Sequence, residues 1–204
     1  MTDDVKSRLQ FRKYTGADIA SVFEDLAHMR MQVFREFPYL YDGTDLSYEM
    51  KYLQTYADSD RSMALTVYDG DQIIGATTCI PLYDETDEIR QAFEKAGPDI
   101  SKVFYFGESI VLKSYRGLGL GHRFFDERES HAGTFGDYEW TSFCAVHRGN
   151  EHPSQPAEYR PNDAFWNKRG YIKMPELNTS MSWADLGDIE QSAKLMEFWL
   201  RRMK

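Results

Sequence analysis

The sequence contains only two cysteines, Cys79 and Cys144, and neither lies at a CxxC or Cys/His metal-ligand spacing. Two cysteines are too few for a disulfide scaffold, and the spacing predicts no metal site. No stretch approaches the roughly 18 consecutive apolar residues that a membrane span requires. The opening residues MTDDVKSRLQ are charged and lack the apolar run of a secretory signal. We therefore expect a cytoplasmic protein that does not act at a membrane.

Positive charge is also scarce. The 204 residues include 24 Lys and Arg against 33 Asp and Glu, which gives a formal net charge of −9. Because so acidic a chain is repelled by phosphate backbones, nucleic acid is not an expected partner. Hydrophobic residues make up 42% of the chain, which is enough to bury a real core. No repeat, low-complexity tract or Pro/Ser-rich linker divides the sequence, so we expect a single domain over residues 1–204.

Hydrophobic periodicity predicts an α/β chain with a mixed sheet. Thr15 and Asp18 form the pattern of a capping box at the start of the first long helix. Asp69-Gly70-Asp71, between two β-rich runs, is a strong hairpin signal. The elements predicted for the first half are a strand at 8–14, helices at 17–34 and 45–58, strands at 63–68 and 72–80, and a loop with a short helix at 84–100.

The second half continues the alternation of strands and helices. Gly107 lies inside a strand pattern and predicts a bulge or a close backbone approach there. Apolar residues at helical spacing after Asp188 predict a final amphipathic helix. The predicted elements are a strand at 103–112, a helix to about 132, a strand at 140–146, a short helix near 162–168, a strand at 171–183 and a C-terminal helix at about 188–203, beyond a core at about 8–185.

The segment from Tyr115 to His122 reads YRGLGLGH, follows a strand and opens a helix. Glycines there let backbone N–H groups converge on an anion, and the helix N-terminus adds unpaired donors and partial positive charge. A diphosphate suits such a loop. The segment lacks the Gly-Lys-Ser/Thr end of a Walker loop, and it lacks the third glycine of a dinucleotide fingerprint.

Arg116-x-x-Gly119-x-Gly121 resembles the motif of the GNAT acyltransferases, the Gcn5-related N-acetyltransferase superfamily. The residues 111–116 (VLKSYR) precede it where that family has a strand end and a turn. The residues 164–171 (AFWNKRGY) are similar to the family's late helix. The order of elements over roughly 8–185 also matches the family.

This resemblance implies a mixed, mostly antiparallel sheet flanked by helices, with acetyl-CoA in the cleft between the fourth and fifth strands. It implies acetyl-CoA as co-substrate, no metal, and direct attack of an amine on the thioester. Backbone groups of Ile110 and Val111 would pair with the pantetheine arm, and one amide would polarise the thioester carbonyl. The implied diphosphate-binding residues are Arg116, Gly117, Leu118, Gly119, Leu120, Gly121 and His122, the last of which is equally a solvated histidine.

The reacting ammonium must lose a proton before it attacks, and Glu108 is the candidate base. Apolar neighbours would raise its pKa, although a glutamate paired with an arginine in the sheet is the alternative. The family often uses a late-helix tyrosine to protonate the leaving thiolate, but Trp166 stands at that position. Tyr159 is the candidate acid in its place, unless it is an ordinary aromatic surface residue or no acid is needed.

The tyrosines between residues 39 and 56 lie in the segment that forms one wall of the acceptor site in the family. Tyr39 and Tyr41, with acidic neighbours, would suit a cationic amine through cation–π and charge attraction, whereas core packing is the alternative. Three further residues carry weaker hypotheses. Cys144 with His147 could form an acyl-enzyme pair or be a small core residue, and Arg148 could reach a CoA phosphate, an acidic substrate or solvent.

The sequence therefore predicts an acetyl-CoA-dependent N-acetyltransferase for a primary amine of a small molecule or a peptide. The alternative is a non-catalytic acyl-CoA-binding or interaction module of the same fold. A third hypothesis is a nucleotide-binding protein that uses the loop for ATP or NAD. The predicted C-terminal helix suits either a homodimer interface or a lid on a monomer.

Overall fold

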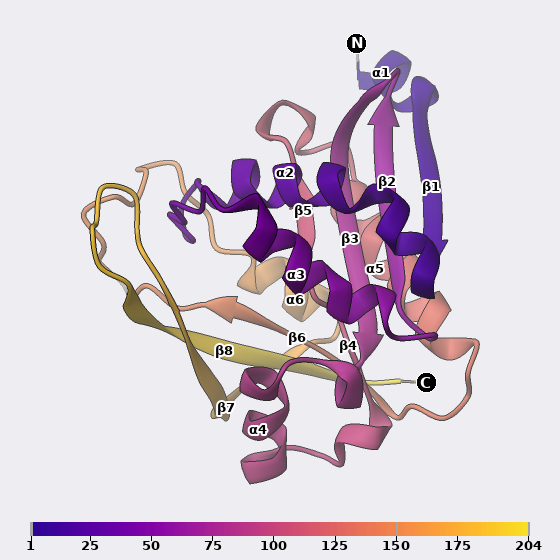
Figure 1. The fold of residues 1–204 in the computed structure, drawn as a ribbon, viewed down its shortest axis with the longest axis vertical. Coiled ribbons are helices and arrows are strands. Elements are labelled where there is room, and N and C mark those ends of the chain that lie inside the picture. Colours follow the sequence, from indigo (N-terminus) through magenta and orange to yellow (C-terminus); the bar gives the residue numbers. More distant parts are fainter. Residues whose placement is uncertain (1, 150, 204) are drawn as a thin grey trace.

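The computed structural model describes residues 2–149 and 151–203. An eight-stranded sheet has the order β1-β2-β3-β4-β6-β8-β7, and β5 pairs with β3 outside this path (Figure 1). Among the described residues the strand pairs are antiparallel except for β4 and β6, which are parallel. The mixed, mostly antiparallel sheet is confirmed. The strands are β1 Leu9–Thr15, β2 Met63–Asp69, β3 Gln72–Pro81, β4 Val103–Tyr105, β5 Ser109–Val111, β6 Trp140–Val146, β7 Ile172–Trp183 and β8 Ser192–Arg202.

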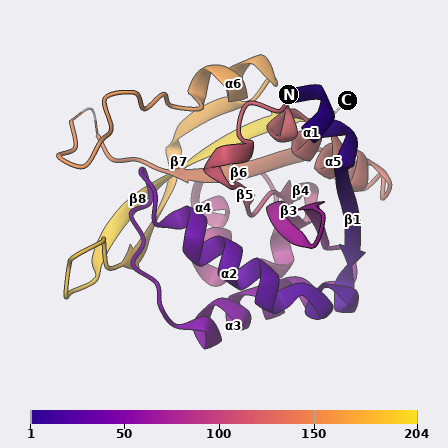
Figure 2. The same cartoon turned by 90° about the horizontal axis from the view of Figure 1, so that it is seen from above.

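Helices cover both faces of this sheet. In Figure 2, α2 and α3 lie on one side of the strands, and α5 and α6 lie on the other. None of the helices described within residues 2–149 and 151–203 has the length and apolar character to cross a membrane. The helices are α1 Thr2–Arg8, α2 Phe23–Phe34, α3 Leu46–Ala57, α4 Asp87–Ala96, α5 Leu120–Gly133 and α6 Asp163–Lys168, with short 3-10 turns η1 Gly16–Val22, η2 Leu82–Asp84, η3 Ile100–Lys102 and η4 Lys113–Tyr115.

Local signals in the sequence explain several of these elements. Gly70 has a φ of +62° in the two-residue turn between β2 and β3, as the Asp-Gly pair predicts. The side chain of Asp45 accepts hydrogen bonds from Ser47 N (2.9 Å) and Tyr48 N (3.2 Å), which caps α3 where a helix was predicted.

The first long helix differs from its prediction. It begins with the 3-10 turn η1, and Thr15 makes no side-chain capping bond, so the capping-box prediction is wrong. Gly16 follows at a φ of +50°, and its N–H donates to Ser62 O at 3.4 Å. The chain therefore turns sharply at the end of β1 before a regular helix can start.

The predicted C-terminal helix at 188–203 is wrong, because β8 fills this segment and lies between β6 and β7. Lys194, Met196, Phe198 and Leu200 are buried, whereas Leu195 between them is 41% exposed and Trp199 packs into a different core cluster from Phe198 and Leu200. That alternation has the period of two of a strand, and the helical spacing that suggested otherwise is fortuitous. A lid or dimer interface built on a C-terminal helix is excluded with it.

Candidate functional site

Two neighbouring strands of the sheet diverge at the site. The Phe106 amide donates to Ser142 O at 2.7 Å, directly after the β4–β6 pairing. Farther along, β5 pairs with β3, whereas β6, which pairs with β8 along its whole length, has no further pairing on its β4 side among the described strands. In the described part of the chain, no strand pairs with the backbone edge of Ser109–Val111 that faces away from β3. We call this edge the split edge.

A bulge at Gly107 and Glu108 divides the predicted strand at 103–112 into β4 and β5. Both amides donate to Thr78 of β3, Gly107 N to its carbonyl oxygen (3.1 Å) and Glu108 N to its Oγ1 (3.0 Å). A Cβ on Gly107 would lie 1.9 Å from the Tyr56 hydroxyl. Only glycine fits there, which confirms the predicted bulge with a close backbone approach.

The hydrogen bonds of β5 determine which backbone groups face the split edge. Thr78 N donates to Glu108 O at 3.1 Å, so this carbonyl points toward β3. Backbone directions alternate along a strand, so Ile110 bonds toward β3 while Ser109 and Val111 present their N–H and C=O groups to the split edge. Of the two residues predicted to pair with pantetheine, Val111 lies with its backbone on this edge.

The glycine loop, Arg116–Gly121, connects η4 to α5. Gly117 and Gly119 have φ values of +81° and +88°, and no atom lies within 4 Å of a Cβ built on either. None of the amides from Gly117 to His122 donates to another described residue. A series of free N–H groups at the start of a 14-residue helix is a suitable site for a diphosphate.

The remaining loop residues connect this segment to its surroundings. Arg116 donates from Nε to Val111 O (3.1 Å) and pairs with Glu36 (2.8 Å), so its side chain joins the loop to the split edge. Leu118 and Leu120 pack against the core. Phe165 of α6 lies 3.5 Å from a Cβ built on Gly121, and its ring centroid lies 4.9 Å from that of the exposed His122.

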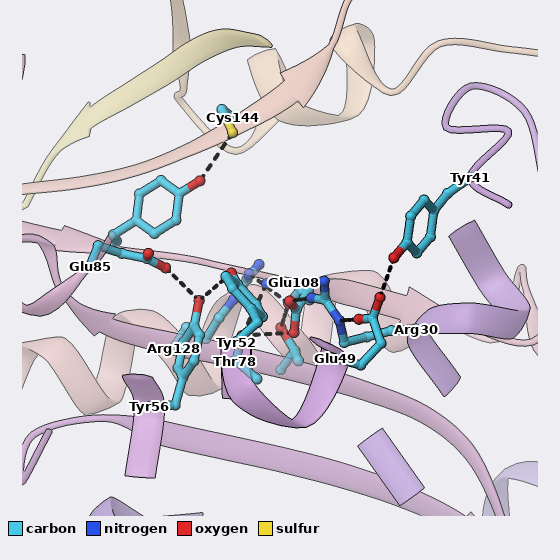
Figure 3. Close-up of polar contacts among 12 residues, drawn as sticks. Arg30, Tyr41, Glu49, Tyr52, Tyr56, Thr78, Glu85, Glu108, Arg128 and Cys144 are labelled. Carbon is cyan, nitrogen blue, oxygen red and sulfur yellow. Dashed lines mark hydrogen bonds and ion pairs between the residues drawn. The ribbon is translucent and has the colours of Figure 1, made fainter. Parts of the chain in front are cut away.

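Glu108 lies directly before the split edge, with 5% of its side chain exposed, and forms an ion pair with Arg30 (Figure 3). The Arg30 Nε atom also lies 2.5 Å from Glu49 Oε2, and its guanidinium lies 4.3 Å from the centre of the Tyr52 ring. Tyr41 donates its hydroxyl to Glu49 Oε1 at 2.6 Å. The structure therefore joins the candidate base to the predicted acceptor residue Tyr41, through an arginine of α2 rather than one of the sheet.

A third buried carboxylate, Glu85, follows directly after η2 and is 3% exposed. It accepts a hydrogen bond from the Tyr56 hydroxyl (2.8 Å), which lies 3.1 Å from that of Tyr52 (Figure 3). The hydroxyl of Tyr105 meets Cys144 Sγ at 3.0 Å. Burial raises the pKa of Glu85, although bonds from the Thr86 amide and Tyr56 partly oppose this. No cation of the described chain lies within ion-pair distance of it.

The buried charges of this region do not balance. Glu49, Glu85 and Glu108 are buried carboxylates, and the guanidiniums among them are those of Arg30 and Arg128. When all are ionised, the region carries one more negative charge than positive. Because an uncompensated buried charge is costly, such a site favours a proton or a bound cation.

Arg30, Glu49 and Glu85 were not predicted as site residues. Arg30 lies four residues after Leu26 on the apolar stripe of α2, and Glu49 lies four residues before Leu53 on that of α3. A charged residue on an apolar stripe was the available signal for both. Glu85 lies in an acidic segment and offered no such signal.

Tyr39 and Tyr159 lie around the turn between α2 and α3. Tyr39 packs on Phe34 with ring centroids 4.6 Å apart, and Tyr159 packs edge-on against Phe37 at 4.6 Å. Burial raises the pKa of both hydroxyls. Tyr159 packs on Phe37, whereas Glu108 pairs with Arg30. The structure therefore does not bring the two predicted catalytic side chains into contact with each other.

Arg148 does not extend to solvent. It forms a bidentate pair with Asp185 (2.6 and 2.8 Å) and donates to the carbonyls of Pro38 (2.6 Å) and Tyr39. Trp183 Nε1 also donates to Tyr39 O at 3.0 Å. The surface alternative for Arg148 is wrong, and this residue anchors the turn that carries Tyr39 and Tyr41.

Cys144 and His147 do not form a catalytic pair. Burial raises the pKa of the Cys144 thiol to about 12, and its partner is Tyr105. His147 lies 3.3 Å from Glu197. Within residues 2–149 and 151–203, no group of three His, Cys, Asp or Glu side chains is placed to hold a metal ion.

Comparisons with known proteins place these features in context. The model of the acetyltransferase (GNAT) family matches residues 25–155, more than half of the chain. No curated protein matches the sequence.

Solved structures share the fold at low sequence identity. Arabidopsis thaliana NAA60 in complex with acetyl-CoA is 12% identical, with a TM-score of 0.60 over 96% of this chain and 98% of that one. Ribosomal-protein-alanine N-acetyltransferase from Brucella melitensis is 14% identical, with a TM-score of 0.60 over 95% and 99% of the two chains. An acetyltransferase of the GNAT family from Streptococcus pneumoniae is also 14% identical, with a TM-score of 0.59 over 95% and 99%.

Proposed function

Because the chain belongs to the acetyltransferase (GNAT) family, we propose that it transfers the acetyl group of acetyl-CoA to a primary amine of a small molecule or a peptide. The observation that carries this proposal is the position of the split edge beside the glycine loop. The bond from Arg116 Nε to Val111 O joins the two directly. One extended ligand with an amide-containing arm and a diphosphate can therefore use both.

The donor substrate fits these two features. The free amides from Gly117 to His122 would bind the CoA diphosphate, with the partial positive charge at the start of α5. The backbone of Val111 would pair with the amides of the pantetheine arm as an added strand does, whereas the neighbouring Ile110 directs its own backbone groups to β3. The thioester would then lie near Ser109 and the bulge, next to Glu108.

The acceptor is proposed to be cationic before it reacts. The buried carboxylates outnumber the buried guanidiniums by one, and Tyr52, Tyr56 and Tyr105 surround Glu85. An ammonium group supplies the missing charge and is attracted to aromatic faces. Tyr39 and Tyr41 would line the entrance to this site from the turn between α2 and α3.

The reaction is proposed to proceed by direct transfer. Glu108 accepts a proton from the ammonium, and the free nitrogen attacks the thioester carbon. The C–N bond forms, the C–S bond breaks as CoA leaves as a thiolate, and the nitrogen releases its surplus proton to solvent to give the neutral amide. Tyr159 is the proposed proton donor to that thiolate, and its phenolate would regain the proton from solvent.

Calorimetric titration with acetyl-CoA, with ATP and NAD as controls, tests the donor. We expect binding of acetyl-CoA alone, and release of CoA thiol when primary amines are added. Binding of ATP or NAD in place of acetyl-CoA would contradict the proposal. Binding of acetyl-CoA without thiol release across a broad amine panel would instead identify a non-catalytic acyl-CoA-binding module.

A further inference from the structure

Arg128 of α5 is a buried cation to which the proposed reaction assigns no step. Its side chain is 2% exposed, lies between Phe106 and Phe125 (4.4 and 4.6 Å to the ring centres), and has no ion-pair partner among the described residues. Burial lowers its pKa to about 10, which still leaves it charged at neutral pH. A buried charge without a counter-ion is costly, so what it contacts is informative.

The guanidinium donates to two backbone carbonyls. Arg128 Nη1 lies 3.3 Å from Glu108 O, and Nε lies 3.3 Å from Phe124 O. Glu108 O also accepts from Thr77 Oγ1 at 2.5 Å and from Thr78 N at 3.1 Å. The carbonyl at the bulge therefore accepts three hydrogen bonds, one of them from a buried positive charge.

We propose that Arg128 and Thr77 are positioning residues that activate the Ser109 N–H as the donor to the thioester oxygen, acting through the carbonyl of Glu108. This inference rests on the proposed function. The Glu108 carbonyl and the Ser109 N–H belong to the same peptide unit and point in opposite directions, the carbonyl toward β3 and the N–H toward the split edge. Hydrogen bonds to the carbonyl polarise the unit and strengthen its N–H as a donor.

The polarised peptide faces the place where charge develops. When an amine attacks the thioester, the carbonyl oxygen becomes negative, and a fixed donor aimed at it stabilises the transition state more than the ground state. The guanidinium behind the same peptide adds a positive potential in a low-dielectric setting. Because this effect acts on the oxyanion, its loss lowers kcat rather than acetyl-CoA affinity.

Thr77→Val is the sharpest test, since it removes one donor to the Glu108 carbonyl without changing charge or volume much. Deleting an oxyanion donor lowers kcat roughly 10²–10³-fold, and weakening one is a smaller effect, so we expect kcat to fall about tenfold. The matched control is Thr66→Val in β2. Thr66 is equally buried and donates to Arg12 O at 3.3 Å, on the opposite side of β2 from β3.

A spectroscopic readout separates activation from general damage. The infrared C=O stretch of bound [1-13C]acetyl-CoA, taken as a difference against unlabelled acetyl-CoA, reports polarisation of the thioester. We expect the band at a higher frequency in Thr77→Val than in the wild type, with Thr66→Val matching the wild type. An unchanged band and kcat in Thr77→Val would overturn the inference while leaving the proposed function intact.

Arg128 variants test the charge itself. Arg128→Lys keeps a cation and Arg128→Met removes it, so we expect kcat and the band shift to follow the order wild type, Lys, Met. Equal kcat in all three folded proteins would overturn the role of the charge. If Arg128→Met does not fold, Thr77→Val decides the question. A wild type that binds no acetyl-CoA would overturn the proposed function, and this inference with it.

Discussion

Arg30 compensates two buried carboxylates at once. It pairs with Glu49 and Glu108 and lies over the face of Tyr52. The pairing holds Glu108 beside the split edge, so the proposed proton transfer to Glu108 would weaken an existing ion pair. A cationic acceptor entering the region can take over part of the role of Arg30, because it brings a second positive charge to the same carboxylates.

Replacement of Glu108 by Gln tests the proton acceptor. General base catalysis typically contributes roughly 10²–10⁴-fold, so we expect kcat to fall by about two orders of magnitude with little change in acetyl-CoA affinity. Steady-state rates over a pH series, with calorimetric titration of acetyl-CoA, measure both. Glu94→Gln, on the exposed side of α4, is the control. Unaltered turnover at every pH would remove Glu108 as the base.

The burial of Glu85 predicts how the free energy of unfolding depends on pH. Burial raises the pKa of Glu85 in the folded chain, so the native state binds a proton more tightly than the unfolded state does. Its contribution to stability is therefore fully present below the unfolded pKa of about 4.3 and is lost as pH rises through the folded pKa. Because glutamine does not titrate, the Glu85→Gln variant does not lose stability at this position as pH rises.

Urea unfolding of Glu85→Gln and the wild type across a pH series checks this sign. We expect the difference between the two free energies of unfolding, variant minus wild type, to increase as pH rises above about 4.3. Above the folded pKa of Glu85 this difference should become constant. The same variant should raise the KM of the amine, because the acceptor loses its carboxylate. A difference that shrinks with rising pH would show that Glu85 is stabilised in its charged form.

The glycine loop depends on backbone conformation more than on side chains. Gly119→Ala puts a Cβ at a φ of +88°, which costs roughly 1–2 kcal/mol of stability. We expect it also to reduce acetyl-CoA binding at least tenfold, because relaxing the strain re-aims the amides at the start of α5. Gly136→Ala, at a φ of +71° in the turn after α5, is a matched control. It should lose similar stability and keep its binding, and equal losses of binding would disprove the assignment of the loop.

The strand and helix assignments of residues 192–202 predict different stability costs for truncating Phe198 and Leu195. Phe198 is fully buried, with its ring 5.0 Å from that of Phe93, whereas Leu195 is 41% exposed. Phe198→Ala should lower the free energy of unfolding by roughly 3–5 kcal/mol, and Leu195→Ala by well under half of that. Denaturant unfolding measures both. An amphipathic helix carrying Leu195 on its apolar face would reverse this order.

Local signals explain which elements the sequence predicted correctly. Gly70 and Asp45 act within a few residues of themselves, so the hairpin and the start of α3 could be predicted. The same holds for Gly107 and for the glycine loop. β8 could not be predicted this way, because residues 192–202 become a strand only through pairing with β6 and β7. Glu85 likewise becomes a site residue only when α3 brings Tyr56 to it.

Three distant parts of the molecule meet at Arg148, which follows β6. The turn between α2 and α3 bonds to the β7–β8 connection through Asp42 N to Ala184 O (3.1 Å) and Leu186 N to Leu40 O (2.8 Å). Arg148 joins both to the end of β6 through its bonds to Asp185 and to the carbonyls of the turn. The turn that carries Tyr39 and Tyr41, the proposed acceptor wall, is therefore held by a connection separate from the glycine loop.

Replacing Arg148 by Met should consequently affect the two substrates differently. We expect the KM of the amine to rise about tenfold, since Tyr39 and Tyr41 lose their anchor, while acetyl-CoA affinity stays unchanged. Removing one partner of a buried pair costs roughly 3–5 kcal/mol, and the cost here is at the lower end because Lys194 remains 3.3 Å from Asp185. Arg61→Met, which breaks the exposed pair with Asp137, is the control.

The double variant Arg148→Met with Asp185→Leu separates positioning from stability. It removes both charges of the pair, so part of the lost stability should return, because the aspartate no longer lies beside an incomplete set of partners. Recovery is incomplete because the buried Lys194 then loses its ion pair with Asp185. The bonds to the carbonyls of Pro38 and Tyr39 are still missing, so the KM of the amine should remain high. If the double variant instead recovers a normal KM together with its stability, the turn needs no anchor and Arg148 serves only to neutralise Asp185. Measuring unfolding and acceptor kinetics on the wild type and the two variants therefore shows whether the bonds from Arg148 to the carbonyls of Pro38 and Tyr39 set the geometry of the proposed acceptor wall.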